Sequence, residues 1–130
     1  MNFELYCVAW TLVLAVAQIL MASTARTAQY GSKWNMSARD GEQAPLKPLP
    51  ARLLRAQANL FETMPIFIAA ILVACIANRT GALTHWGALL YLAARIIYLP
   101  LYAMGIPVVR TLVWMVSLVG IAMCLFAILF

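Results

Sequence analysis

Four polar side chains recur at helical spacing in a mostly apolar segment and are the first candidates for chemistry: Arg52, Arg55, Asn59 and Glu62. An α-helix turns about 100° per residue, so these four residues fall within one stripe roughly 80° wide. Guanidinium groups bind carboxylates through paired, charge-assisted hydrogen bonds. An ionisable residue at membrane depth is costly, so the stripe indicates a functional site.

A second polar stripe follows in the next apolar segment, at positions i, i+4, i+7 and i+11: Tyr91, Arg95, Tyr98 and Tyr102. These side chains also share one face of a helix. At 1.5 Å per residue, Glu62 and Arg95 both lie roughly 15 Å inside their apolar segments. Each would otherwise be an uncompensated buried charge, so we expect an ion pair between them.

The composition defines the class of protein that carries these stripes. Of the 130 residues, 65% are hydrophobic and only 10% are charged, whereas a soluble domain is roughly 45–50% apolar. The net charge of +5 comes from basic residues beside apolar segments. No polar domain combines basic and aromatic residues as a nucleic-acid-binding surface does. The chain is therefore predicted to be an integral membrane protein that binds no nucleic acid.

Four apolar segments are each long enough to cross a bilayer, which takes about 20 residues. We expect spans at about 5–25, 51–78, 83–104 and 107–130. Pro65 lies inside the second span and should kink it beside Glu62, because proline removes a backbone hydrogen bond. The predicted fold is an all-α bundle of four transmembrane helices in a single domain over residues 1–130.

A cleaved signal peptide is an alternative for the first span, but Glu4 stands where a basic residue is expected. The loop at residues 26–50 is polar, and four of its residues are basic: Arg26, Lys33, Arg39 and Lys47. Basic loops remain in the cytoplasm, which places both termini on the other side of the membrane. The expected location is a bacterial inner membrane.

Residues that commonly ligate metals or act as nucleophiles are isolated in this sequence. His85 is the only histidine, and Cys7, Cys75 and Cys124 stand in separate apolar segments. A zinc site needs several such ligands close together, so no metal site is expected. No Ser-His-Asp set or glycine-rich phosphate loop is present. The chain itself therefore offers no recognisable set of catalytic residues.

The two stripes together resemble a motif of the MAPEG family, the membrane-associated proteins in eicosanoid and glutathione metabolism. In this chain the motif is Arg52-x-x-Arg55-Ala-Gln57-Ala-Asn59-x-x-Glu62-x-x-Pro65-x-Phe67, then Arg95-x-x-Tyr98-x-x-x-Tyr102, then Arg110. The resemblance extends to the order of the four spans and the long basic first loop. It implies a homotrimer of four-helix bundles, with glutathione in a cleft between neighbouring subunits that opens to the cytoplasm.

The resemblance also implies roles for individual residues. Contacts to glutathione are expected from most of the two stripes: Arg52, Arg55, Asn59, Glu62, Arg95, Tyr98 and Tyr102. Gln57 lies about 160° from Arg55 on the helical wheel, and in the family such a glutamine serves the neighbouring subunit's site, as Arg26 is also expected to do. Arg110 would stabilise the glutathione thiolate and is the one expected catalytic residue.

The implied activity is a glutathione transferase or peroxidase acting on a lipophilic electrophile that arrives through the membrane. A non-catalytic scaffold that binds lipid or fatty acid is the alternative within the same fold. Structural explanations also stay open: basic anchors at Arg52 and Arg55, and an interfacial aromatic belt at Tyr98 and Tyr102. A channel is disfavoured because nothing polar continues through the last span. The expected partners are two further copies of the chain, membrane lipids and the lipophilic substrate.

Overall fold

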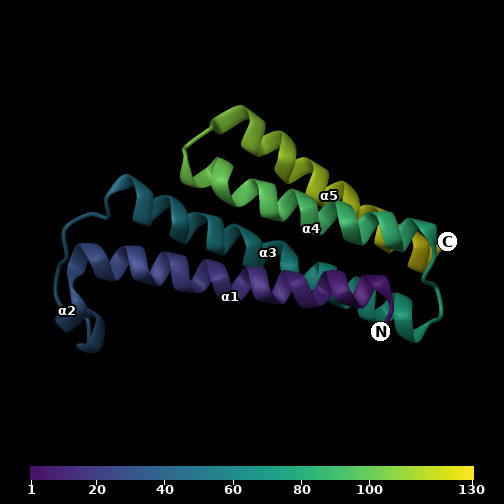
Figure 1. Cartoon of the computed structure of the whole chain (residues 1–130), viewed down its shortest axis with the longest axis horizontal. Coiled ribbons are helices and arrows are strands. Elements are labelled where there is room, and N and C mark those ends of the chain that lie inside the picture. Colours follow the sequence, from purple (N-terminus) through teal and green to yellow (C-terminus); the bar gives the residue numbers. More distant parts are fainter.

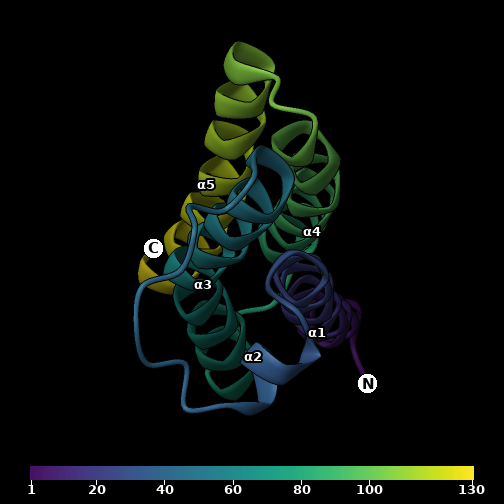
Figure 2. The ribbon, with the colours of Figure 1, turned by 90° about the vertical axis from the view of Figure 1, so that its left-hand side faces the viewer.

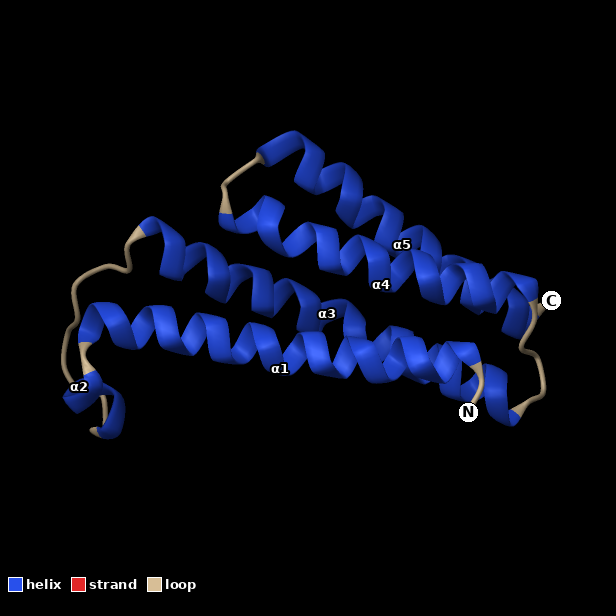
Figure 3. Ribbon diagram, in the orientation of Figure 1, coloured by secondary structure: helices blue, strands red, loops and turns tan.

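The computed structural model describes residues 1–130 and contains helices and no strand (Figures 1 and 3). The helices are α1 (Phe3–Tyr30), α2 (Ser32–Met36), α3 (Pro48–Ile76), α4 (Ala82–Ala103) and α5 (Pro107–Leu129). All except α2 are long and apolar enough to cross a membrane. The predicted all-α fold with four membrane-spanning helices is confirmed.

The expected loop at residues 26–50 is partly helical in the structure. Helix α1 continues to Tyr30 instead of ending near residue 25, and the five-residue helix α2 lies inside the expected loop at residues 26–50. The polar residues near the end of α1 are compatible with a helix, so the helix continues through them. It ends at Gly31, whose φ of 95° is not helical. The Gln29 side chain then accepts a hydrogen bond from the Lys47 backbone at 2.8 Å, which ties this loop to the start of α3.

Helices α1 and α3 run antiparallel, and α4 and α5 form a second antiparallel pair against α3 (Figure 1). Seen from the end that carries α2, α1 and α5 lie at opposite corners of the bundle, with α3 and α4 between them (Figure 2). Both termini lie at the end of the bundle remote from α2 (Figure 1). The turn from α4 to α5 lies toward the end that carries α2, as does the start of α3 (Figure 1).

The core lies where α1, α3, α4 and α5 meet, and a polar contact lies within it. Phe67 of α3 stacks on Tyr91 of α4, with 4.1 Å between the ring centroids. The Tyr91 hydroxyl hydrogen-bonds the Thr63 hydroxyl at 2.9 Å. A buried tyrosine needs such a partner for its hydroxyl. Tyr91 of the second stripe is therefore a core residue, and this contact fixes the register of α4 on α3.

Helices α4 and α5 approach through two glycines. A Cβ atom added at Gly87 would lie 2.7 Å from the Gly120 carbonyl oxygen, and one at Gly120 would lie 2.6 Å from the Gly87 carbonyl oxygen. Small residues at such a crossing allow the backbones of membrane helices to come close. The contact sets how near α5, which carries Arg110, lies to the tyrosines of α4.

Enlarging this contact should separate the two helices. We expect Gly120→Ala to lower the free energy of unfolding by about 1–3 kcal/mol, the usual cost of overpacking. Thermal unfolding in detergent measures the loss. Gly81→Ser is the matched control, because a side chain there meets nothing within 4 Å and serine is a good N-cap residue. Equal melting temperatures for the two variants would contradict a tight α4–α5 contact.

Candidate functional site

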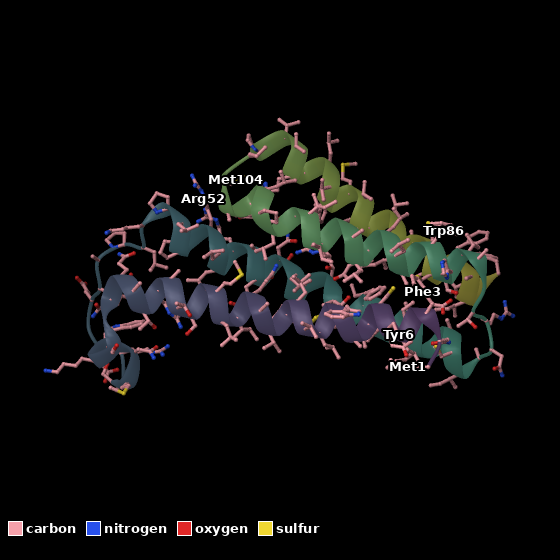
Figure 4. All side chains as sticks on the ribbon, viewed as in Figure 1. Met1, Phe3, Tyr6, Arg52, Trp86 and Met104 are labelled. Atoms are coloured by element: carbon pink, nitrogen blue, oxygen red, sulfur yellow. The ribbon has the colours of Figure 1, made fainter.

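The two predicted stripes meet near the turn between α4 and α5. Arg52 of α3 and Met104 at the end of α4 lie next to each other in Figure 4. An Arg52 Nη1 atom lies 3.5 Å from the Ala103 carbonyl oxygen. Gly105, with a φ of 73°, leaves room for this guanidinium, since a Cβ atom there would approach the Arg52 Cζ to 2.8 Å. The glycine thus permits both the turn and the position of Arg52.

Tyr102 lies between two further arginines. The Arg55 Nε donates to the Tyr102 hydroxyl at 3.1 Å. The Arg110 Cζ lies 4.6 Å from the centroid of the Tyr102 ring, on the helix that follows the turn. A guanidinium over an aromatic face is held by attraction to the ring. Tyr102 thereby orients cationic groups from α3 and α5 toward one space.

That space is a pocket of about 300 Å³ with three arginines and no carboxylate in its wall. Its lining residues are Arg52, Arg55, Tyr102, Gly105, Ile106, Pro107 and Arg110. A smaller pocket of about 160 Å³ is lined by Asn59, Tyr98, Arg110, Thr111 and Trp114. Arg110 belongs to both. The site therefore has a cationic compartment suited to carboxylates, a compartment with amide, hydroxyl and indole groups, and one guanidinium between them.

Arg95 lies behind this site and does not line either pocket. It is fully buried, and its Nη1 donates to Asn59 Oδ1 at 2.7 Å. Its Cζ lies 4.3 Å from the centroid of the Tyr98 ring, and Tyr98 packs edge-on against Tyr102. Because Asn59 Oδ1 is engaged by Arg95, the Asn59 NH₂ group is left to donate toward the smaller pocket. Arg95 thus orients two residues of the pocket wall.

The prediction of an ion pair between Glu62 and Arg95 is wrong. Glu62 is exposed in the chain, and the Arg95 Nε and Nη2 atoms have no hydrogen-bond partner. The reason is the orientation of α3, whose buried face is centred near Phe67. On the helical wheel Glu62 lies about 140° from Phe67, while Asn59 lies about 80° from it. Asn59 is therefore the stripe residue within reach of Arg95.

The structure brings together most of the other expected site residues. Six of them line the two pockets: Arg52, Arg55, Asn59, Tyr98, Tyr102 and Arg110. Gln57 is half-buried on another side of α3 and lines neither pocket. Arg26, near the end of α1, instead has its Cζ 5.6 Å from the centroid of the Trp34 ring in α2. In the single chain, Gln57 and Arg26 lie away from the site.

Sequence reasoning missed Trp114 as a residue of the site. Its indole is half-buried, lines the smaller pocket, and its Nε1 has no hydrogen-bond partner. An indole N–H is a donor only, so it offers the pocket one more hydrogen bond. The available signal was its spacing of four residues from Arg110, which puts both on one helix face. A tryptophan in an apolar span otherwise indicates contact with lipid.

A bundle of four membrane-length helices with an arginine- and tyrosine-lined pocket at one end defines a class of small integral membrane proteins. The profile of the MAPEG family matches residues 5–130, so the chain belongs to the MAPEG family. The family resemblance inferred from the motif is thereby confirmed. This family includes glutathione transferases and peroxidases as well as non-catalytic members. No curated protein and no solved structure matches the chain.

Proposed function

We propose that the protein is a membrane-bound, glutathione-dependent transferase or peroxidase that acts on lipophilic electrophiles. The observation that carries this proposal is the position of Arg110, shared by a cationic pocket and a smaller hydrogen-bonding pocket. Glutathione has two carboxylates, one ammonium and one thiol. Its carboxylates suit the guanidinium groups of Arg52 and Arg55. Its thiol suits the position beside Arg110, where a cation favours the reactive thiolate.

The exposed carboxylate of Glu62 supports a site completed by further copies of the chain. Glu62 lies well inside a membrane-spanning helix yet is exposed in the single chain. A carboxylate facing lipid at this depth is costly, so a partner must cover it. We propose a homotrimer in which Glu62 faces the cleft between subunits and receives the ammonium of glutathione. Arg26 and Gln57, which lie outside the pockets of their own chain, would serve the neighbouring site.

The orientation of the bundle fits a cytoplasmic source of glutathione. Both termini lie at one end of the bundle, and the basic loop lies at the other (Figure 1). Basic loops remain in the cytoplasm. We therefore propose that the loop over residues 26–50 faces the cytoplasm of a bacterium and that both termini lie outside the inner membrane. The turn at Gly105, which lines the larger pocket, is then on the cytoplasmic side.

Titration calorimetry of purified protein with glutathione tests the proposed ligand. Wild-type protein should bind it, and Arg55→Ala should weaken binding about 10- to 100-fold, because a hydrogen bond to a charged group contributes about 1.5–3 kcal/mol. Lys33→Ala removes the same charge from an exposed position in α2 and should bind like the wild type. If wild-type protein does not bind glutathione, the transferase proposal fails and a lipid-binding scaffold of the same fold is the better explanation.

A further inference from the structure

Helix α1 contains a buried polar side chain that the site described above does not use. Gln18 is 1% exposed, and neither its Nε2 nor its Oε1 has a hydrogen-bond partner. Arg95, also fully buried, likewise has two guanidinium nitrogens without a partner. Nearly all buried polar groups in proteins are hydrogen-bonded, and in a membrane no solvent replaces a missing partner. Two such side chains in one small bundle call for a common explanation.

The register of α1 on α3 places Gln18 at the level of Asn59. At one end of this antiparallel pair, Asn2 Nδ2 contacts Cys75 Sγ at 3.4 Å. Sixteen residues separate Asn2 from Gln18, and sixteen separate Asn59 from Cys75. Both side chains therefore lie about 24 Å along the bundle from this contact, at 1.5 Å per residue. Asn59 in turn holds the guanidinium of Arg95.

The face of α1 that carries Gln18 also reaches α4. On this face Glu4 accepts a hydrogen bond from the Thr84 hydroxyl of α4 at 2.7 Å. Gln18 lies about 40° from Glu4 on the helical wheel and further along the same buried stripe. Gln18 lies 14 residues after Glu4 on α1, and Arg95 lies 11 residues after Thr84 on α4. The two side chains therefore start from positions that differ by three residues, or about 4.5 Å along the bundle. A guanidinium at the end of its flexible side chain spans that difference.

We propose that Gln18, Asn59 and Arg95 form one buried polar cluster, and that Gln18 is a positioning residue for the glutathione site. The Gln18 Oε1 accepts a hydrogen bond from a single buried water, which in turn accepts from the free guanidinium nitrogens of Arg95. This second acceptor holds Arg95 on Asn59 Oδ1 and keeps the Asn59 NH₂ group directed at the smaller pocket. The cluster itself stands on the geometry, whereas its role in binding rests on the function proposed above.

Ligand-free protein tests the cluster without any assumption about function. Gln18→Glu places a carboxylate beside Arg95 and should raise the melting temperature in detergent by about 5 °C, since roughly 1 kcal/mol shifts it by several degrees. Thr11→Glu is the matched control, because Thr11 is fully buried on the same helix face, seven residues before Gln18. No arginine of α3 or α4 lies at the level of Thr11. Thr11→Glu should lower the melting temperature. Arg95→Leu added to Gln18→Glu should also lower it. A fall for Gln18→Glu equal to that for Thr11→Glu would overturn the cluster.

Glutathione titration then tests the positioning role. Gln18→Leu removes one acceptor from the cluster, so it should lower the melting temperature slightly and weaken glutathione binding about tenfold, whereas Gln18→Glu should keep wild-type affinity. Wild-type affinity in Gln18→Leu would overturn the positioning role. If wild-type protein fails to bind glutathione, the proposed function and the positioning role fail together, and the melting temperatures still decide whether the cluster exists.

Discussion

Arg110→Ala should still bind glutathione but lose the glutathione thiolate. A free thiol has a pKa near 8.5, so only a few per cent is ionised at neutral pH. Lowering that pKa by about two units takes roughly 2.7 kcal/mol of preferential stabilisation of the thiolate. The Arg110 guanidinium, between the two pockets, is placed to supply it. Without it, the thiolate fraction at pH 7, and with it the rate of conjugation to an aromatic electrophile, should fall about 25-fold, and the ultraviolet absorbance of the thiolate should nearly disappear.

The pH dependence distinguishes this role from a loss of binding. If Arg110 lowers the pKa of the bound glutathione thiol by about two units, the wild-type rate should be nearly constant from neutral to alkaline pH and fall only in acid. In Arg110→Ala the rate should rise with pH until about 8.5, and affinity should stay within about tenfold of wild type because Arg52 and Arg55 hold the carboxylates. Arg79→Ala, an exposed arginine near the termini, is the control. A thiolate signal retained in Arg110→Ala would contradict the assigned role.

Asn59→Leu should destabilise the protein even without glutathione. Asn59 accepts the one hydrogen bond that the structure shows from the fully buried Arg95. Leaving a buried charged group without its partner costs about 3 kcal/mol, which corresponds to a fall of roughly 10 °C in melting temperature. Glutathione affinity should also fall sharply, because the amide that lines the smaller pocket is gone. Thermal unfolding and titration calorimetry measure the two effects separately.

Three further variants assign that loss to Arg95. Asn59→Asp keeps the acceptor oxygen and should retain stability. Adding Arg95→Leu to Asn59→Leu removes the unpaired charge and should restore part of the stability without restoring binding. Glu62→Gln, which alters an exposed side chain on the same helix, should change the melting temperature little. Equal stability of Asn59→Leu and wild-type protein would show that Arg95 finds another partner.

The apolar runs were sufficient to predict the fold. Helical spacing singled out Arg52, Arg55 and Tyr102, the family resemblance added Arg110, and these four residues line one pocket in the structure. Spacing on one helix shows which residues share a face, but it does not show how that face is turned toward the neighbouring helices. This is why Glu62, and not Asn59, was expected to pair with Arg95. For the same reason, the sequence did not show that Trp114 faces the smaller pocket.

Gln18 illustrates a different limit of sequence reasoning. One glutamine in an apolar span has no partner at helical spacing, so nothing in its own segment indicates a role. Its level with Asn59 follows only from the contacts that fix the register of α1 on α3. Contacts between segments far apart in the sequence therefore show which residues of different helices lie at the same level, and spacing within one helix does not.

The connection between α4 and α5 has a consequence for the rates of ligand exchange. It contains only Met104, Gly105 and Ile106, and the two helices also meet at Gly87 and Gly120 further along. Because they are joined at both places, we expect α4 and α5 to move as one body, with Tyr102 and Arg110 at a fixed separation whether or not the pocket is occupied. Opening of the pocket would then require movement of the first half of α3, which follows a long loop. If glutathione is the ligand, we therefore expect α3 to set the rates of its association and dissociation, while the groups around the thiol stay in place.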